Sequence, residues 1–326
     1  MTTTRPTIVA HSPAMQAVIV GVNKAAAVQT GVLLCGEAGT GRRMVARELH
    51  HLSPGPDAPF VAVDCAEVEE LEATLFGAST TPSNGGPDHR QGLDRISTTS
   101  VLCGAVGGTL FLAHLPEMPT RVQARLARIL RDGEVTIQEG KRTLPLRVRL
   151  IASSEPDWKT AVAEGRIRAD LCKRCSASRI DLPPLRNRRE DIPLLATAFL
   201  EEACAASHLE PKEIDPPAMA LLSALPWRGN VREMQALIHS LAAVLPGTFL
   251  RLEDLLGSVH LDDSARTFVA AGTLRQAKER FERDYIVAVL ERHRGRIGEA
   301  ARALGIQRPN LYRKMRTLRL PLPRHA

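Results

Sequence analysis

Apolar residues follow two alternating patterns before Arg188. Short continuous apolar runs are typical of strands that are buried on both faces. Such runs lie within residues 31–36, 58–66, 107–115 and 146–154. Between them, apolar residues three and four positions apart predict amphipathic helices. These helices are expected within residues 14–29, 42–53 and 120–133. Strands that alternate with helices predict an α/β fold, a parallel sheet with helices on both faces.

The pattern changes at about Arg188, where the strand-like runs stop. Residues 257–272 are polar and without a period, which is typical of a linker. Helical spacing is found on both sides of this linker, within residues 189–207, 216–227, 230–245 and 273–318. The chain is therefore expected to contain an α/β domain, an all-α segment and a separate helical domain at its C-terminus.

Two finer expectations concern the α/β domain. In the helix at residues 42–53, the apolar face should consist of Met44, Val45, Leu49 and Leu52. Between Ala78 and Val106, Gly, Ser, Thr and Pro are frequent, and this composition predicts one long loop or insertion.

Charge is unevenly distributed along the 326 residues, whose net charge is +7. From Thr273 to the end there are 14 Lys or Arg against 5 Asp or Glu, so the preceding residues are close to neutral. A basic terminal block is the electrostatic footprint of a nucleic-acid-binding protein. A solvated basic tail without a ligand is the alternative.

Composition excludes other classes of protein. No apolar run approaches the ~18 residues that a membrane span needs, and the first residues do not resemble a signal peptide. A cytoplasmic protein without membrane partners is therefore expected, with its six cysteines as reduced thiols. Cys172 and Cys175 form a lone C-x-x-C without a second pair or a nearby His, so no metal site is predicted.

The sequence GEAGTGRR, residues 36–43, lies between a predicted strand and a predicted helix. Its spacing is that of G-x-x-x-x-G-K-[ST], in which loop amides and a helix N-terminus surround a phosphate. Arg42 stands where the motif has Lys, and Arg43 where it has a hydroxyl for Mg²⁺. The predicted nucleotide-binding residues of the loop are Gly36, Glu37, Ala38, Gly39, Thr40, Gly41, Arg42 and Arg43. A vestigial loop that binds no ligand is the alternative.

The C-terminal domain has the pattern of a helix-turn-helix. IGEAARALGI and QRPNLYRKMRTL read as two short helices around a turn at Gly305, with Ala300, Ala301 and Leu304 inward. Pro309 suits the first turn of the second helix. An exposed, DNA-binding face of that helix is predicted from Gln307, Arg308, Asn310, Arg313, Lys314 and Arg316. A preceding helix with Ile286 on its apolar face is expected from Thr273 onward. A basic bundle for protein contacts is the alternative.

From about residue 8 to residue 320, the chain resembles the AAA+ transcription activators that work with sigma-54, the NtrC class of bacterial enhancer-binding proteins. The motifs that carry this resemblance occur in order. They are SPAMQAV, GEAGTGRRMVARELHHLS, PFVAVDCA, GGTLFLAHLPEMPTRVQARLARILRDGEV, VRLIASSEPDW, EGRIRADLCKR, LPPLRNRREDIPLL and PWRGNVREM. The resemblance implies an AAA+ subdomain at 8–184, a helical lid at 185–256, a linker at 257–272 and a Fis-type DNA-binding domain at 273–326.

The resemblance also implies roles for single residues. Arg168 and Arg174 stand at the two arginine-finger positions, and Arg232 at the second sensor, where it would bind nucleotide. Simple ion pairing at a surface or subunit interface is the alternative for the two finger residues.

This sequence departs from the family pattern at several sites. Ala113 and His114 replace the Asp-Glu pair of the second nucleotide motif, and Glu155 replaces the first-sensor Asn. Arg228 replaces a Pro of the lid motif, and the Gly-Ala-Phe-Thr-Gly-Ala loop that contacts sigma-54 does not occur between Gly77 and Gly107. No catalytic residue is therefore predicted, and ATP would bind without turnover and with Mg²⁺ poorly held.

The sequence thus predicts a DNA-binding transcription regulator with a degenerate AAA+ module. It would act independently of sigma-54 or with a partner. The expected partners are double-stranded DNA, a second copy through the C-terminal domain, a ring of copies or an active homologue, and RNA polymerase holoenzyme. The alternatives are an ATP-hydrolysing sigma-54 activator and a sensor of nucleotides or cyclic dinucleotides.

Overall fold

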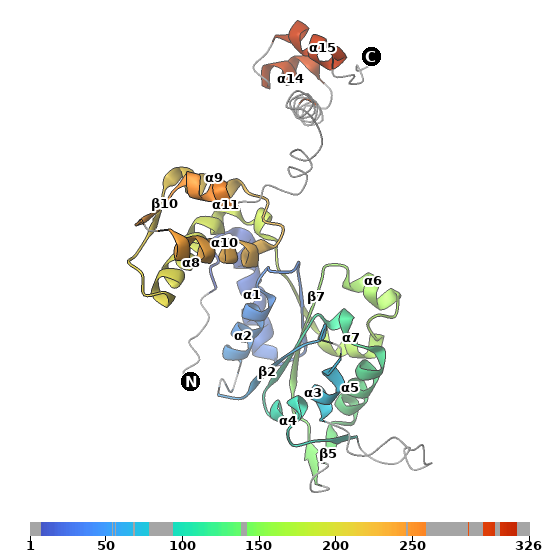
Figure 1. Ribbon diagram of the computed structural model, residues 1–326. Coiled ribbons are helices and arrows are strands. Elements are labelled where there is room, and N and C mark those ends of the chain that lie inside the picture. Colours follow the sequence, from blue (N-terminus) through green and yellow to red (C-terminus); the bar gives the residue numbers. More distant parts are fainter. Residues whose placement is uncertain are drawn as a thin grey trace. The chain divides into compact units, whose positions relative to one another are not determined.

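The computed structural model describes residues 8–53, 55, 57–67, 69–77, 94–137, 142–245, 247–258, 286, 296–303 and 307–317. The chain divides into two compact units, residues 1–258 and residues 259–326 (Figure 1). None of the helices in the described ranges is long and apolar enough to cross a membrane.

A five-stranded sheet forms the centre of the first unit. Its strand order is β2-β4-β7-β1-β8, and all neighbouring strands are parallel. The strands are β1 (Val32–Cys35), β2 (Phe60–Asp64), β4 (Thr109–Ala113), β7 (Arg149–Ser154) and β8 (Ser178–Asp181). This sheet confirms the predicted parallel α/β arrangement, and each long apolar run of the sequence contributes one strand.

Helices cover both faces of this sheet (Figure 1). One face packs against α1 (Pro13–Val28) and α2 (Arg42–His51). The other packs against α3 (Leu71–Phe76), α5 (Thr120–Asp132) and α7 (Ala169–Cys175), with α6 (Trp158–Ala163) beside them. Alternate residues of a strand point to opposite faces, so Phe111 of β4 joins the first core while Leu110 and Leu112 join the second.

The apolar face of α2 differs from the prediction. Val45, Ala46 and Leu49 are buried, whereas 39% of Met44 and 37% of Leu52 are exposed. A helix turns by 100° per residue. Val45 and Leu49 therefore form the middle of the apolar stripe, and Met44 and Leu52 lie at its edges.

The stretch predicted as one long loop is partly ordered into secondary structure. Residues 94–106 contain β3 (Arg95–Ile96) and α4 (Val101–Gly104), whose Ile96 and Leu102 are fully buried in the core. Strand β3 joins β5 (Glu134–Ile137) and β6 (Thr143–Pro145) in a second small sheet. The loop prediction was wrong here because two buried residues among Ser and Thr give no periodic signal. Residues 78–93 lie outside the described part.

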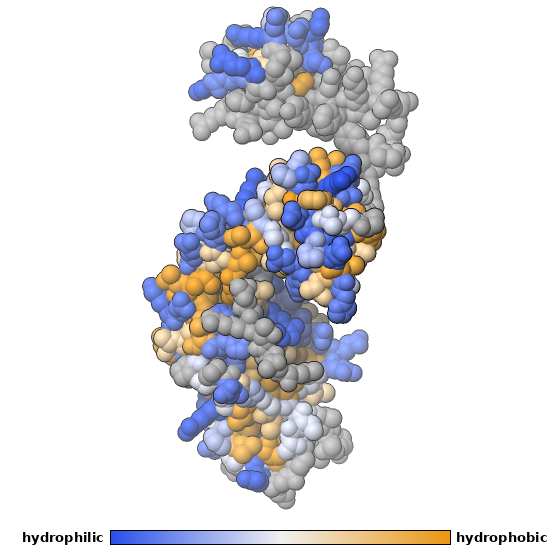
Figure 2. Space-filling model, turned by 90° about the vertical axis from the view of Figure 1, so that its left-hand side faces the viewer, coloured by the Kyte–Doolittle hydropathy of each residue, from blue (hydrophilic) through white to orange (hydrophobic). Residues whose placement is uncertain are grey.

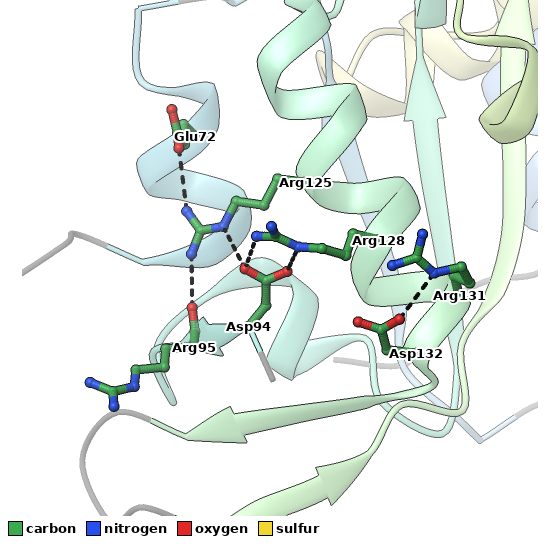
Figure 3. Close-up of polar contacts among 7 residues, drawn as sticks. All are labelled: Glu72, Asp94, Arg95, Arg125, Arg128, Arg131 and Asp132. Carbon is green, nitrogen blue, oxygen red and sulfur yellow. Dashed lines mark hydrogen bonds and ion pairs between the residues drawn. The ribbon is translucent and has the colours of Figure 1, made fainter. Parts of the chain in front are cut away.

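Arginines of α5 hold this small sheet against the main core (Figure 3). The Arg125 guanidinium lies 4.2 Å from the ring centroid of Phe76, donates a 2.8 Å hydrogen bond to the Arg95 carbonyl, and pairs with Glu72 and Asp94. Arg128 pairs with Asp94 through both its Nε and Nη2 atoms. The α5 arginines thus join α3, before the segment 78–93, to β3, which follows it.

Arg125→Ala is expected to lower the free energy of unfolding by about 1–2 kcal/mol, because it removes the contact with the Phe76 ring and the hydrogen bond to the Arg95 carbonyl. Urea unfolding followed by tryptophan fluorescence would measure this loss. Arg131→Ala is the matched control on the same helix, since Arg131 is 68% exposed and its partner among the described residues is Asp132. Equal losses for the two variants would contradict the assigned role of Arg125.

The rest of the first unit is helical, as predicted. Its helices are α8 (Ile192–Ala206), α9 (Pro216–Ala224), α10 (Asn230–Val244) and α11 (Leu252–Ser258). The expectation that strands stop at about Arg188 was wrong in one detail, since β9 (Glu213–Ile214) and β10 (Phe249–Leu250) form a parallel pair. Strands of two residues are too short to show a period. Helix α11 includes the first two residues of the predicted linker, and residues 259–272 lie outside the described part.

A buried carboxylate connects the helical segment, residues 185–258, to the start of α1. Asp191 is fully buried and accepts hydrogen bonds from the backbone amides of His11 (2.8 Å) and Ser12 (2.7 Å). It also accepts one from the Ser12 hydroxyl (2.8 Å), whose oxygen in turn accepts from the amide of Met15 and so caps α1. The helical segment and the first helix are therefore joined through one side chain.

The second unit is described at Ile286, α14 (Ile297–Ala303) and α15 (Arg308–Thr317). Its small core contains Ile286, Ile297, Ala300, Ala301, Leu311 and Met315. Ala300 and Ala301 point inward as predicted, and Pro309 lies in the first turn of α15. Thr273 and Leu304 lie outside the described residues.

Candidate functional site

The predicted phosphate loop connects β1 to α2. Gly39 (φ +76°) and Gly41 (φ +100°) have left-handed backbone conformations, which glycine adopts without strain. Helix α2 begins directly after Gly41, so its first amides lack intrahelical partners. This is the geometry of an anion-binding helix N-terminus.

A cavity of about 750 Å³ lies against this loop, between the ends of β2 and β4 and the helical segment. Of the predicted nucleotide-binding residues, it is lined by Gly39, Thr40, Gly41, Arg42, Arg43 and Arg232. Gly36, Glu37 and Ala38 belong to the same loop but do not line the cavity. Ala113 and His114, at the end of β4, do line it.

Arg42 is turned back onto its own loop. The side chain is only 7% exposed, and its Nη1 donates a 2.9 Å hydrogen bond to the carbonyl of Gly36. Burial lowers the pKa of the Arg42 guanidinium, while the negative charge of Glu155 partly offsets this effect. Glu155 itself is exposed just after β7 and does not line the cavity. Arg42 therefore braces the loop as well as facing the cavity.

The end of β4 carries an imidazole instead of a carboxylate. Ala113 lies opposite Asp64 in the β2–β4 register. His114 has a left-handed backbone (φ +53°), and its Nδ1 lies 2.8 Å from Oδ1 of Asp64. Burial raises the pKa of Asp64, but its hydrogen bonds with His114 and with the Ala66 amide outweigh this and lower it. The Asp64 carboxylate at this end of the sheet is thus hydrogen-bonded to His114.

Asp64 was not among the predicted site residues. The available signal was its place as the last residue of a buried strand, because ligands of parallel sheets bind at the carboxyl ends of the strands.

The residues around this edge do not fit a divalent cation. In the part of the chain that the structure describes, no group of three or more His, Cys, Asp or Glu side chains is arranged to hold a metal ion. At nucleotide sites Mg²⁺ is held by one or two carboxylates together with phosphates and waters. Here the carboxylate at the strand ends, Asp64, is hydrogen-bonded to His114, and Ala113 supplies no second one.

The C-x-x-C pair lies in a buried part of the first unit. Cys172 and Cys175 are buried on α7 and are free thiols, like the other four cysteines. Burial raises the pKa of the Cys175 thiol to about 12 and raises that of Cys172 as well. Burial therefore disfavours the thiolate form of both side chains.

The helical segment holds the loop through an ion pair. Arg186 donates to both carboxylate oxygens of Glu37, from Nη1 at 2.8 Å and from Nη2 at 2.5 Å. These bonds, with a further one from Asn230, lower the pKa of Glu37 to about 2 against the opposing effect of burial. Glu37 therefore stays ionised and attached to Arg186 at neutral pH.

Further bonds run from the helical segment to the backbone of the loop. Asn230 Nδ2 donates to the Ala38 carbonyl (2.9 Å), Arg188 Nη2 to the Thr40 carbonyl (2.9 Å), and the Arg232 amide to the Gly39 carbonyl (3.3 Å). A Cβ atom on Gly39 would lie 2.1 Å from the carbonyl oxygen of Gly229, so no side chain fits there. The helical segment thus contacts three successive residues of the loop.

Sequence reasoning identified only Arg232 in this set. Arg186 and Arg188 were part of a recognised motif, and that cluster of arginines at the entry to the helical segment was the available signal.

The predicted finger residues lie apart from the cavity. The guanidinium of Arg168 pairs with Asp170 at 2.8 Å, and its backbone amide donates to Gln123 Oε1. Arg174 is exposed on α7. Neither lines the cavity, so within one chain the structure does not bring them to the loop.

The second unit presents a polar helix face. Gln307, Arg308, Asn310 and Arg313 are exposed and Lys314 is half-buried, while Leu311 and Met315 face the core. The side chain of Arg316 lies outside the described residues. Figure 2 shows that the described residues of this unit have a largely hydrophilic surface. Four of the residues predicted to meet DNA, Gln307, Arg308, Asn310 and Arg313, are therefore exposed on this unit.

Three family models match successive parts of the chain. The model described as the sigma-54 interaction domain matches residues 8–181, and that of the AAA+ ATPase lid domain matches residues 186–268. The model of the Fis family of bacterial regulatory proteins matches residues 278–318.

Individual relatives show the same similarity over nearly the whole chain. It is 35% identical to the regulatory protein AtoC of Escherichia coli over 94% of this chain and 67% of AtoC. It is 35% identical to the DNA-binding transcriptional regulator NtrC of Escherichia coli over 95% of this chain and 70% of NtrC. The crystal structure of NtrX from Brucella abortus in complex with ATP superposes with a TM-score of 0.66, at 30% identity, over 96% of this chain and 70% of that one. The chain thus spans about two thirds of the length of these relatives.

Proposed function

The chain belongs to the family of sigma-54-dependent transcriptional regulators, with an AAA+ module, a lid and a Fis-type DNA-binding domain, and from this we propose that it is a DNA-bound regulator whose AAA+ module binds ATP without hydrolysing it.

The end of β4 is the observation that carries this proposal. Phosphoryl transfer depends on a metal ion and on a group that positions the attacking water. Ala113 supplies no metal ligand, and His114 is hydrogen-bonded to Asp64 at 2.8 Å. Both changes lie at one strand end, and together they would cost several orders of magnitude in rate. The module is therefore described best as a degenerate ATPase.

Nucleotide binding is supported by the cavity and by a relative. The start of α2 after Gly41 and the residues Arg42, Arg43 and Arg232 line one space large enough for a nucleotide. NtrX of Brucella abortus has been crystallised with ATP and with ADP. We infer that the loop residues 36–43 and Arg232 hold the phosphates of ATP here.

DNA binding would be carried by the exposed face of α15. Residues near its N-terminus, Gln307, Arg308 and Asn310, would meet base edges, and Arg313, Lys314 and Arg316 would meet phosphates. We propose that two copies bind together through the domain at 273–326. Because the sequence between Gly77 and Gly107 lacks the sigma-54 contact loop, the regulator would act without remodelling sigma-54 holoenzyme itself.

An ATP-hydrolysing activator is the second candidate. The family is ordinarily an ATPase family, and the His114–Asp64 pair favours this candidate because a carboxylate-oriented imidazole can accept a proton from water. It would need a metal ion at an edge that lacks metal ligands, which weighs against it.

With ATP and Mg²⁺, the purified protein is expected to retain bound nucleotide and to release no phosphate above a protein-free blank. Both quantities should be followed in the same sample over time. Phosphate release that Arg42→Ala abolishes would contradict the proposal and favour the second candidate. Absence of both binding and release would mean that the module serves only as a scaffold for the DNA-binding domain.

A further inference from the structure

The side chains around the cavity carry an unusual balance of charge. Four of the lining residues are arginines, Arg42, Arg43, Arg188 and Arg232, whereas only two, Asp64 and Glu202, are acidic. Guanidinium groups match phosphate oxygens with bidentate geometry and stay protonated at any physiological pH. The cavity therefore compensates a highly charged anion with the chain's own cations.

Arg43 stands at the loop position where the motif has a hydroxyl for Mg²⁺. It stands one residue after Arg42 in the first turn of α2, lines the cavity, and is close enough to Asp64 to help lower the pKa of that carboxyl. Asp64 is thus flanked by a guanidinium and by the imidazole of His114. A divalent cation at this place would be repelled by Arg43 and would find Asp64 already paired.

Arg188 adds a further positive charge to the wall of the cavity. The side chain is 3% exposed, lines the cavity, and donates from Nη2 to the Thr40 carbonyl. Its Nε–H is buried and has no hydrogen-bond partner among the described residues. This Nε–H is shielded from the cavity as well, so Arg188 contributes to an anion site through the positive charge of its guanidinium at the cavity wall.

We propose that the cavity binds a nucleoside polyphosphate as the metal-free anion, with the guanidinium of Arg43 in place of a divalent cation. This inference rests on the nucleotide binding proposed above, and goes beyond it by naming the ionic form of the ligand. The free polyphosphate carries more negative charge than its Mg²⁺ complex, and the surplus of guanidinium groups suits that form.

Calorimetric titration with ATP, in Mg²⁺ and again in excess EDTA, tests this inference on the full chain. The dissociation constant in EDTA is expected to be within about threefold of that in Mg²⁺, or lower. Tightening by Mg²⁺ of more than this would overturn the inference and leave the proposed nucleotide binding intact. If ATP bound in neither buffer, the proposed nucleotide binding itself would be wrong.

Arg43→Ala gives the second measurement, in EDTA. Loss of one charge-assisted contact is expected to weaken ATP binding about tenfold. Arg47→Ala is the matched control, since it removes the same charge from an exposed position of α2 that does not line the cavity, and its affinity should equal that of the wild type. Wild-type affinity in Arg43→Ala would overturn the assignment of Arg43.

Discussion

Arg313→Ala combined with Lys314→Ala is expected to weaken binding to duplex DNA by roughly 10- to 100-fold at 0.1 M salt, whatever the sequence of the duplex. Each phosphate contact releases about one counterion, so the loss of two contacts should also make the slope of log K against log salt less steep by about 2. The physical reason is the position of these cations on α15: Leu311 and Met315 are buried, Arg313 is exposed on the opposite face, and Lys314 is half-buried at the side of the helix.

Fluorescence anisotropy with labelled duplexes at several salt concentrations would measure both effects. The matched control is Arg121→Ala combined with Arg131→Ala, which removes the same charge from exposed positions of α5 in the first unit. That variant should keep the wild-type affinity and slope. If both double variants lost the same affinity, net charge alone would explain the binding, and the role given to α15 would be wrong.

Asp191→Ala should lower the free energy of unfolding of the first unit by about 3–5 kcal/mol, because it leaves buried donors without an acceptor. The carboxylate is fully buried and accepts from two backbone amides and the Ser12 hydroxyl. Such a loss is a large part of the 5–15 kcal/mol that typically stabilises a domain. Urea unfolding followed by the fluorescence of Trp158 and Trp227 would measure it.

Two further variants test whether the loss of stability in Asp191→Ala comes from the missing acceptor oxygens of this carboxylate. Asp191→Asn keeps one acceptor oxygen and should lose only part of this free energy, whereas Asp170→Ala removes a carboxylate that is 53% exposed and should lose little. A loss in Asp191→Ala no larger than that in Asp170→Ala would show that Asp191 does not join the helical segment to α1.

The central sheet and most helices could be predicted because burial dictates the residue pattern there. Strands such as β1 and β4 are covered on both faces, so they read as continuous apolar runs. Short elements could not be found this way: β9 and β10 have two residues each. Met44 was misplaced for a related reason, since periodicity locates the centre of an apolar stripe better than its edges.

The candidate site was predictable only in part. The loop 36–43 follows from a local motif, whereas the partners of that loop come from residues almost 200 positions away, such as Asn230. The pairing of Asp64 with His114 likewise depends on the order of strands in the sheet, which brings the ends of β2 and β4 together. Local sequence carries no record of such contacts, and only the three-dimensional arrangement reveals them.

The contact between Gly39 and the Gly229 carbonyl has a consequence for communication within the first unit. No space is left there for a side chain, and the loop carbonyls are hydrogen-bonded to Arg188, Asn230 and Arg232. The loop and the helical segment are therefore expected to move together. A ligand that changes the conformation of the loop must also change the contacts of the helical segment. If a ligand at the loop changes the affinity of the helical segment for a partner protein, that partner changes the affinity of the loop for the ligand by the same factor. Such coupling needs no hydrolysis, so a module without turnover can still transmit a signal.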